Sequence, residues 1–342
     1  MRAWLLHNIT DIKLQSQPLC NQEVAKPNPG FLELLIKVSA CGVCHTELDE
    51  IEGRTPPIHF PMILGHQVVG YVSSIGKDVS KFKIGDRVGI GWIYSACGTC
   101  DHCKAGNDNL CQAFMATGRD MPGGYAEFMT ISENFAFRIS DFFKDEEAAP
   151  LLCAGAIGYR SLRLTHLKDG QRLGLTGFGA SGHLVLMLAK YQLPNSDIYV
   201  FARSEKERQF ARELGAAWVG DTMDTPPRLC HAIIDTTPVW KPVVEALRCL
   251  ESGGRLIINA IRKESHDQDY LLDLNYPEHL WMEKEIKSVA NVAKCDISEF
   301  LEIAAKISIR PEIQVYPFES ANEALVDLKA GKIRGAKVLK IS

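Results

Sequence analysis

Three residues with metal-binding side chains stand at turns between apolar runs of this chain. Cys44 comes two residues after Gly42, His66 follows Gly65, and Cys153 comes two residues before Gly155. Two thiolates and an imidazole are ligand types that zinc prefers, and three protein ligands leave a fourth position open for a reacting molecule. The set therefore predicts a zinc centre that takes part in a reaction.

A second group of thiols lies between these residues in the sequence. Its spacing is C-x2-C-x2-C-x7-C, formed by Cys97, Cys100, Cys103 and Cys111. Four thiolates so close in sequence can surround one tetrahedral metal ion. An iron–sulfur cluster is the rival interpretation, but ferredoxin spacing places the fourth cysteine four residues after the third and a proline after it. Here the fourth cysteine comes eight residues later and is followed by Gln112.

The segment around His66 carries a longer pattern, Gly65-His66-x3-Gly70-x5-Gly76-x2-Val79. With the two cysteine groups, it resembles the zinc-dependent alcohol dehydrogenases of the medium-chain dehydrogenase/reductase family, most closely the bacterial AdhA-like branch. The resemblance spans essentially the whole chain. It implies two Zn²⁺ per subunit, a catalytic ion held by Cys44, His66 and Cys153 and a structural ion held by the four cysteines.

Composition sets the broad class. The chain has 342 residues, enough for two domains, with 46% hydrophobic and 23% charged residues. Its net charge of −4 gives no indication of nucleic-acid or anionic-membrane binding. We expect no membrane segment and no export signal, hence a cytoplasmic protein whose cysteine content indicates metal binding or catalysis rather than disulfides.

Short β-rich segments make up the N-terminal part. Strands are predicted at 31–38, 68–72 and 87–90, with turns between them, as in an antiparallel, barrel-like domain. The resemblance implies a GroES-like β-barrel catalytic domain over 1–150 and 291–342, to which the chain returns through 331–338.

Residues 151–290 carry the pattern of a Rossmann domain, which makes the fold class α/β. A strand at 172–176 leads into a G-x-G-x-x-G loop and a helix over 183–189. Further strands are predicted at 198–201, 232–235, 254–259 and 286–289, and a helix at 298–307. The loop can cradle the pyrophosphate of a dinucleotide; its residues are Gly177, Phe178, Gly179, Ala180, Ser181 and Gly182.

The end of the second strand indicates which dinucleotide binds. An NAD enzyme places an acid there for the ribose hydroxyls, whereas this chain has Arg203 and Ser204. Arg203 can pair with a 2′-phosphate and Ser204 can add a hydroxyl donor, which favours NADP(H) over NAD(H). The alternative is a solvated arginine at a helix start, with Glu205 reaching the ribose of NAD.

The resemblance also implies roles around the catalytic zinc. The ion would bind the oxygen of a small alcohol or aldehyde, with Thr46 hydrogen-bonded to that oxygen and His45 beside the cofactor pyrophosphate. Trp92 would narrow the substrate pocket toward primary alcohols. Each of these residues also has a purely structural interpretation. Thr46 would then be a hydroxyl at a helix start, His45 a surface residue and Trp92 an aromatic residue of the core.

Two positions depart from the family pattern. Asp49 stands where many relatives end a proton relay with histidine, and an ordinary aspartate is a poor shuttle at neutral pH, so protons would leave through solvent. Gln67 replaces the usual glutamate after the histidine. We hypothesise that the zinc is then a stronger Lewis acid.

Two other functions compete with this one. An NADPH-dependent enone or quinone reductase of the same superfamily needs no zinc ligands. A non-catalytic sensor, a zinc module joined to a nucleotide-binding domain, has no need of an open three-ligand site. Family analogy predicts a homo-oligomer, a dimer or tetramer, with a small-molecule alcohol or aldehyde as its substrate.

Overall fold

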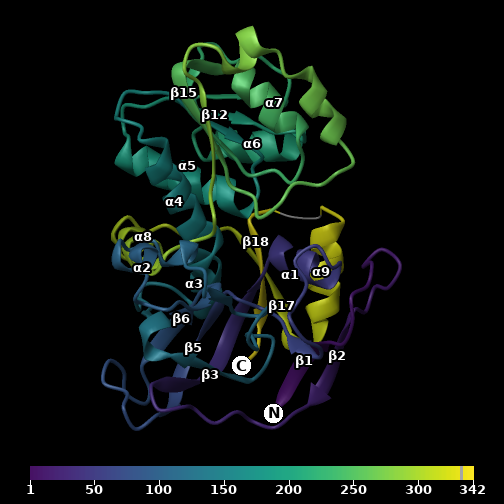
Figure 1. The fold of residues 1–342 in the computed structure, drawn as a ribbon, viewed down its shortest axis with the longest axis vertical. Helices are drawn as coiled ribbons and strands as arrows, with labels where there is room; N and C mark the ends of the chain where they lie inside the picture. The colour runs from purple at the N-terminus through teal and green to yellow at the C-terminus, as the bar shows by residue number, and fades with distance from the viewer. Residues whose placement is uncertain (332–333) are drawn as a thin grey trace. The chain divides into compact units, whose positions relative to one another are not determined.

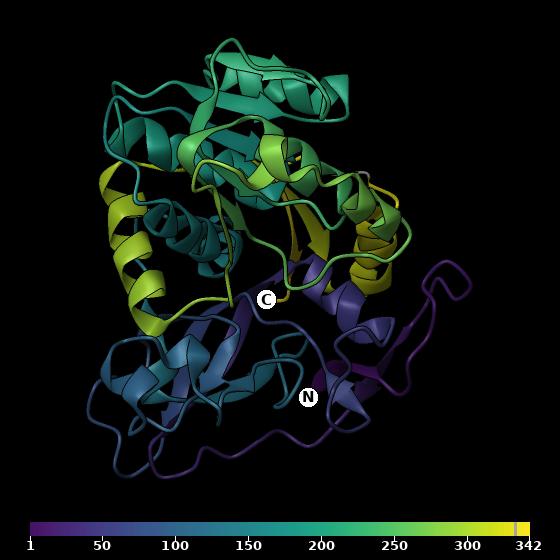
Figure 2. The same cartoon turned by 45° about the horizontal axis from the view of Figure 1, so that its top comes forward.

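The computed structural model describes residues 1–331 and 334–342 (Figures 1 and 2), which form two units. The first unit comprises 1–156 and 292–342, and the second comprises 157–291. Both boundaries fall slightly beyond those expected at 150 and 290, so Cys153 belongs to the first unit. The returning stretch 331–338 also belongs there, but its residues Lys332 and Ile333 lie outside the described part of the chain.

Strands of the first unit, within the described residues, form a seven-stranded sheet, a three-stranded sheet and a two-stranded sheet. The strands are β1 Arg2–Leu6, β2 Leu19–Glu23, β3 Glu33–Val43, β4 Met62–Ile63, β5 Val68–Ile75, β6 Arg87–Ile90, β7 Ile93–Ser95, β8 Met115–Ala116, β9 Phe128–Ser132, β10 Phe137–Arg138, β17 Ile313–Pro317 and β18 Ala336–Lys340. The helices are α1 His45–Ile51, α2 Asp101–Lys104, η1 Asp108–Leu110, η2 Glu133–Phe135, α3 Asp145–Ala148, η3 Ala149–Leu152, α8 Lys294–Lys306, η6 Phe318–Ser320 and α9 Ala321–Lys329. Helix α4, Ala154–Thr165, begins in this unit. The mostly antiparallel strands confirm the expected GroES-like domain, and the expected strands at 31–38, 68–72 and 87–90 are β3, β5 and β6.

Strand β3 is central to this unit because it leads directly to Cys44. It pairs antiparallel with β5, β9 and β18, and Val43 stands opposite Lys337. In Figure 1 the purple β3 therefore runs beside the yellow β18, although the two are far apart in sequence. Most side chains of β3 are buried, and fully buried ones such as Leu34 and Ile36 stabilise the fold by about 1.5–3 kcal/mol each.

Helix α1 follows β3 and is tied to helix α9. Lys329 Nζ lies 2.8 Å from Glu52 Oε2, just after the end of α1. Arg54 also forms an ion pair with Glu52. These charges fix the helix that begins at the first predicted metal ligand.

The second unit is built on a six-stranded sheet of entirely parallel strands, in the order β13-β12-β11-β14-β15-β16. The strands are β11 Leu173–Thr176, β12 Ile198–Phe201, β13 Trp218–Gly220, β14 Cys230–Asp235, β15 Leu250–Ile258 and β16 Glu285–Ser288. The helices are α5 Ala180–Gln192, α6 Glu205–Glu213, α7 Lys241–Arg248, η4 Gln268–Asp273 and the π-helix η5 Tyr276–Leu280. The short, fully buried strands β11 and β12 are typical of parallel sheets with covered faces, which confirms the predicted Rossmann domain.

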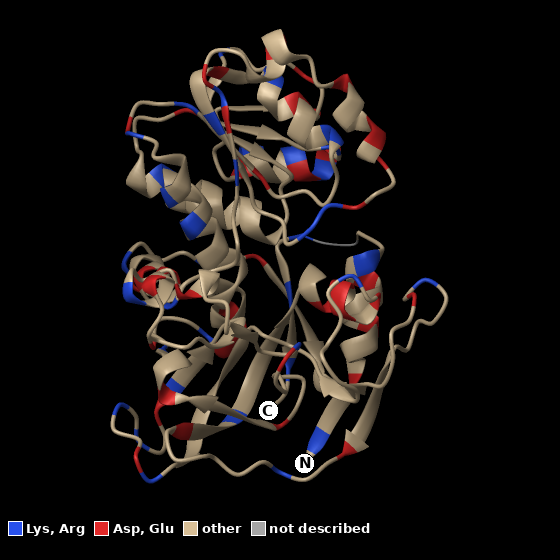
Figure 3. Ribbon diagram, in the orientation of Figure 1, with Lys and Arg blue, Asp and Glu red and all other residues tan. Residues whose placement is uncertain are grey.

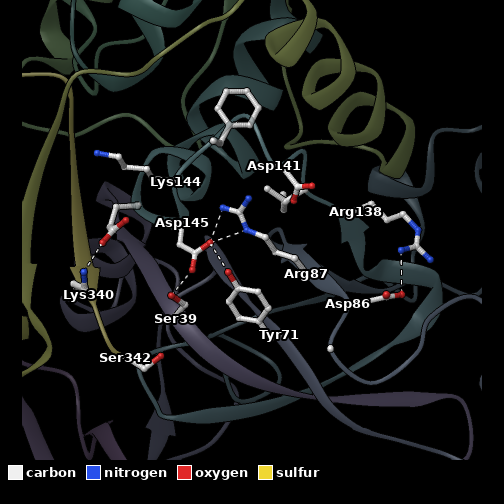
Figure 4. A pocket seen from close by; sticks show the side chains of 14 residues that line it. Ser39, Tyr71, Asp86, Arg87, Arg138, Asp141, Lys144, Asp145, Lys340 and Ser342 are labelled. Atoms are coloured by element: carbon white, nitrogen blue, oxygen red, sulfur yellow. Dashed lines mark hydrogen bonds and ion pairs between the residues drawn. The ribbon is translucent and has the colours of Figure 1, made fainter.

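A hollow of about 760 Å³ lies in the first unit, away from the predicted ligands (Figure 4). Asp145 lies at its centre, accepting hydrogen bonds from Ser39 Oγ at 2.5 Å and Arg87 Nε at 2.7 Å. Asp86 pairs with Arg138 at 3.0 Å at its edge. These charges bind one another, so the hollow is not our candidate site.

No helix in the described part of the chain has both the length and the apolar character needed to cross a membrane.

Candidate active site

Cys44 lies at the junction of β3 and α1. Its extended backbone, with φ −129° and ψ 166°, makes it the residue that caps the start of α1. Its backbone N–H donates to Glu47 Oε2 at 2.8 Å, which satisfies one of the free donors at the helix start. The sulfur is thereby presented at a fixed position, and Thr46 Oγ1 lies 3.7 Å from it.

His66 is held between a carboxylate and a thiol. Its ring is buried, with Nδ1 2.6 Å from Glu47 Oε1 and Nε2 3.2 Å from Cys153 Sγ. Gly65 permits this placement because its φ is +95° and an added Cβ would lie 2.4 Å from the Tyr125 ring. With Nδ1 engaged by the carboxylate, Nε2 faces the thiols as a ligand atom.

Cys153 completes the group at the end of η3. The ligand atoms of Cys44, His66 and Cys153 all lie within 4.8 Å of one another. A tetrahedral zinc separates a sulfur from a nitrogen ligand by about 3.5 Å, close to the distance from His66 to Cys153. The residues present therefore fit a zinc ion with three protein ligands.

Proton sharing within this group indicates what a cation would replace. The hydrogen bond from Cys153 holds the pKa of Cys44 well below its usual value, and the same contact raises the pKa of Cys153. Burial opposes charge on His66, but Glu47 and Cys44 together raise its pKa well above the usual value. A bound divalent cation takes the place of these protons.

Glu47 was missed by the sequence analysis although it contacts two of the three predicted ligands. It is fully buried, and burial raises its pKa while His66 lowers it. Its position three residues after Cys44, in the first turn of α1, resembles an ordinary helix cap. The Cys-x-x-Glu spacing was the available indication, since a carboxylate commonly orients a metal-bound histidine.

The three residues of α1 that were predicted to act beside the catalytic zinc or the cofactor, His45, Thr46 and Asp49, have different surroundings. His45 is exposed and Thr46 half-buried on the first turn of α1. Asp49 is buried and accepts hydrogen bonds from Arg54, with Nε at 2.7 Å and Nη2 at 2.6 Å. Arg54 therefore engages the carboxylate that stands at the relay position of the family.

Trp92 and Gln67 are both buried. The Trp92 ring lies 5.3 Å from the ring of Phe114, and the Arg119 guanidinium lies 5.2 Å from it. Gln67 extends across β3, where a Cβ on Gly42 would lie 2.5 Å from its Oε1. The carboxylate that contacts His66 therefore comes from α1 rather than from position 67.

The four cysteines form a second group in the same unit. Their sulfur atoms all lie within 4.8 Å of one another, and Cys97 Sγ is 3.9 Å from Cys103 Sγ. Tetrahedral zinc separates two sulfur ligands by about 3.8 Å, so this group also fits the ion. N–H groups of Thr99 and Cys100 lower the pKa of Cys97 to about 5, whereas burial raises the pKa of Cys103 to about 12.

The G-x-G-x-x-G loop of the second unit joins β11 to α5. Gly177 has φ +77°, and a Cβ on Gly182 would lie 2.8 Å from the Gly177 carbonyl oxygen. Phe178 is buried against Phe210, at 5.5 Å between ring centroids. No side-chain hydrogen bond caps the start of α5 among the described residues, and a helix N-terminus of this kind favours an anion.

Arg203 and Ser204 follow β12, but they differ in freedom. Arg203 is exposed, whereas the Ser204 hydroxyl donates to Glu207 Oε2 at 2.8 Å and accepts from the Glu207 N–H at 3.2 Å. Arg208 Nη1 donates to the carbonyl oxygen of Arg203 at 3.2 Å. Glu205, the alternative ribose ligand, pairs with arginines of its own helix, α6, where Figure 3 shows both charge signs side by side.

Comparison with known proteins adds independent information. Residues 29–141 match the family model of the alcohol dehydrogenase GroES-like domain. Over 333 residues the chain is 43% identical to the "Probable alcohol dehydrogenase AdhA" of Mycobacterium tuberculosis (strain CDC 1551 / Oshkosh), covering 96% of this chain and 94% of that protein.

Two solved structures share the fold. One is titled as CAD from Helicobacter pylori complexed with NADP(H), with a TM-score of 0.86, 24% identity and coverage of 99% of this chain and 97% of that one. The other is an NAD-dependent alcohol dehydrogenase, with a TM-score of 0.90, 21% identity and full coverage of both chains. Because one title names NADP(H) and the other NAD, the fold does not select the dinucleotide.

Proposed function

Since this chain belongs to the zinc-dependent alcohol dehydrogenases of the medium-chain dehydrogenase/reductase family, we propose that it interconverts primary alcohols and aldehydes with NADP(H) as its cofactor. The observation that carries this proposal is the Cys44, His66 and Cys153 group, whose ligand atoms lie within 4.8 Å of one another around an acid-bound imidazole. That arrangement has the three ligands and the open position of a catalytic zinc.

The chemistry is divided between bound groups and the chain. When bound, zinc supplies a Lewis acid for the substrate oxygen and the nicotinamide supplies or accepts hydride. In our proposal Cys44, His66 and Cys153 hold the metal, and Glu47 orients the imidazole. Thr46, 3.7 Å from Cys44 Sγ, is close enough to the centre for its hydroxyl to bind the substrate oxygen. Because the Asp49 carboxylate is bound by Arg54, the proton released from the alcohol leaves to solvent rather than through Asp49.

A second zinc per subunit would be held by the four cysteines. Cys97 to Cys103 at 3.9 Å and the tight turns at Gly98 and Gly106, both with φ above +70°, support a closed site. Such a site has no open position, so its role is to hold a loop in place.

NADP(H) is favoured by the charges after β12. Arg203 is exposed without a carboxylate partner among the described residues, while Glu205 is paired with Arg208 and Arg212. The 2′-phosphate of NADP(H) would therefore contact the Arg203 guanidinium. The ribose diol of NAD(H) would need Glu205, which is already paired with arginines.

We test this with initial rates of reduced-cofactor oxidation in zinc-replete protein, comparing NADPH with NADH over several aldehydes. We expect faster turnover with NADPH, and a fall of about 10-fold or more in kcat/KM for NADPH in Arg203→Ala. Lys206→Ala, which removes an exposed positive charge from the same helix, α6, and leaves the pairs of Glu205 intact, is the matched control and should keep the preference for NADPH.

Each other result has a defined meaning. A wild-type preference for NADH would overturn the cofactor alone. Turnover of a ketone as fast as of an aldehyde would overturn the primary-alcohol assignment that Trp92 suggests. Absence of turnover with either cofactor would favour the enone reductase or the non-catalytic sensor, and the sensor would still bind cofactor in Cys44→Ser.

Homo-oligomerisation is also part of the proposal. Strand β16 is the edge of the six-stranded sheet, and all four of its side chains are exposed. Trp281 and Met282, just before it, are each more than half exposed. An exposed edge strand beside apolar side chains can pair with a second copy of the chain.

A further inference from the structure

Glu50 is a buried carboxylate that stands close to the predicted catalytic metal site. It lies on α1, six residues after Cys44, and its side chain is fully buried. Within residues 1–331 and 334–342, neither of its carboxylate oxygens has a hydrogen-bond partner. Burying a charge in this way is strongly unfavourable unless an opposite charge lies nearby.

The groups around Glu50 are those of the metal site. Glu47 and Glu50 are three residues apart on α1, so they share one face of the helix. Burial raises the pKa of Glu50 well above its usual value; the charges of Glu47 and Cys44 raise it further, whereas His66 and Arg119 lower it. The charges of two of the three predicted zinc ligands, Cys44 and His66, thus act on the Glu50 carboxyl group.

Arg119 is not a direct partner that would explain the burial. Its Nε and Nη2 bind the two carboxylate oxygens of Asp120, at 2.9 and 2.6 Å. Its guanidinium also lies over the Trp92 ring. A divalent cation held by Cys44 and His66 would be the largest positive charge in the neighbourhood of Glu50.

We propose that Glu50 is a positioning residue of the Cys44, His66 and Cys153 centre, whose buried carboxylate strengthens zinc binding from behind the ligands. This inference rests on the proposed catalytic zinc. It also assigns a source for the negative charge that position 67 does not provide, since Gln67 is neutral and buried next to His66. Glu47 orients the ring by contact, whereas Glu50 acts on the metal through charge alone.

The test measures zinc retention rather than turnover. Zinc-loaded wild type, Glu50→Gln and Glu50→Leu are mixed with a coloured chelator, and the two zinc ions per subunit are followed separately by their release rates. We expect both variants to release the zinc of the Cys44, His66 and Cys153 centre at least about 10-fold faster than wild type. Mutating groups that contact or surround metal ligands commonly changes metal affinity by 10–100-fold. The zinc of the four cysteines should be released at the wild-type rate.

Glu50→Leu separates this role from a structural one. Replacing an unpartnered buried acid by an apolar side chain should leave the melting temperature of zinc-free protein unchanged or higher, while zinc retention falls. Glu133→Gln is the control for losing a buried acid elsewhere in the unit, since Glu133 binds the N–H groups of Ser80 and Lys81. It should leave the release of both zinc ions unchanged.

The outcomes distinguish this inference from the proposed function. If wild type and both Glu50 variants release zinc from the Cys44, His66 and Cys153 centre at equal rates, the role of Glu50 is overturned. Faster zinc release from both centres together would overturn it as well. If wild type itself binds zinc only at the four cysteines, the proposed catalytic centre fails, and the inference fails with it.

Discussion

At the scale of single residues, Glu47 joins the first two ligands of the candidate site. One of its oxygens accepts the Cys44 N–H at 2.8 Å, and the other lies 2.6 Å from His66 Nδ1. The same carboxylate therefore fixes the start of α1 and the direction of the imidazole. A change at this position should disturb the metal site without removing a ligand.

Glu47→Gln tests this point. The amide can still accept the Cys44 N–H but supplies no charge to His66, so we expect kcat/KM to fall by about 10- to 100-fold. Metal analysis should show weaker zinc retention at the Cys44, His66 and Cys153 centre and full zinc occupancy of the four-cysteine centre. Unaltered kinetics and metal content would contradict the role given to Glu47.

The residues predictable from the sequence are those whose type alone suggests a ligand. Cys44, His66 and Cys153 could be selected because their side chains are of the types that bind zinc and their surroundings resemble the family pattern. Glu47 could not, since its function depends on His66, which the fold brings to it from 19 positions away. The partner of Asp49 was also hidden, because a nearby Arg54 in the sequence does not reveal its side-chain direction.

At the scale of elements, local patterns predicted the Rossmann strands well and the ends of the elements less well. The strand expected at 198–201 is β12. The helix expected at 298–307 is α8, which begins at Lys294 because Asp296 accepts the Ala293 N–H at 2.9 Å. Strand β3 continues to Val43, where β18 pairs with it, a contact that no local pattern contains.

Asp86, directly before β6, gives a prediction about how stability depends on pH. The Lys83 N–H and the Arg138 guanidinium both bind its carboxylate and lower its pKa. Figure 4 shows the contact with Arg138. Because the folded pKa lies below the unfolded value of about 3.9, the stabilisation is complete above that pH and is lost as the pH falls through the folded pKa.

Asp86→Asn should therefore lower the melting temperature by about 2–4 °C at pH 7, and the difference from wild type should shrink below about pH 4. Thermal unfolding of wild type and variant side by side, at equal zinc content at each pH between 3 and 8, measures this. Asp78→Asn, at an exposed site in the same unit, is the control. A difference that grows on acidification would show that the sign is wrong.

At the scale of the whole molecule, the edge strand β16 gives a prediction about assembly. Ile286→Lys adds a charge to a side chain that is 47% exposed on that edge. Light scattering after size exclusion should show a homo-oligomer for wild type and a smaller species for the variant. Ile84→Lys, at a 64% exposed isoleucine of the first unit, should leave the mass unchanged. A monomeric wild type at micromolar concentration would refute the assembly.

The pairing of β3 with β18 also has a consequence for biosynthesis. The residues just before Cys44 pair with β5 on one side, but they acquire β18 on the other side only when Lys337 to Lys340 have been translated. During synthesis, Cys44 and His66 leave the ribosome long before that strand exists. The catalytic centre should thus accept its zinc after translation ends, whereas the four-cysteine loop, whose ligands all lie between Cys97 and Cys111, can load its ion on the nascent chain.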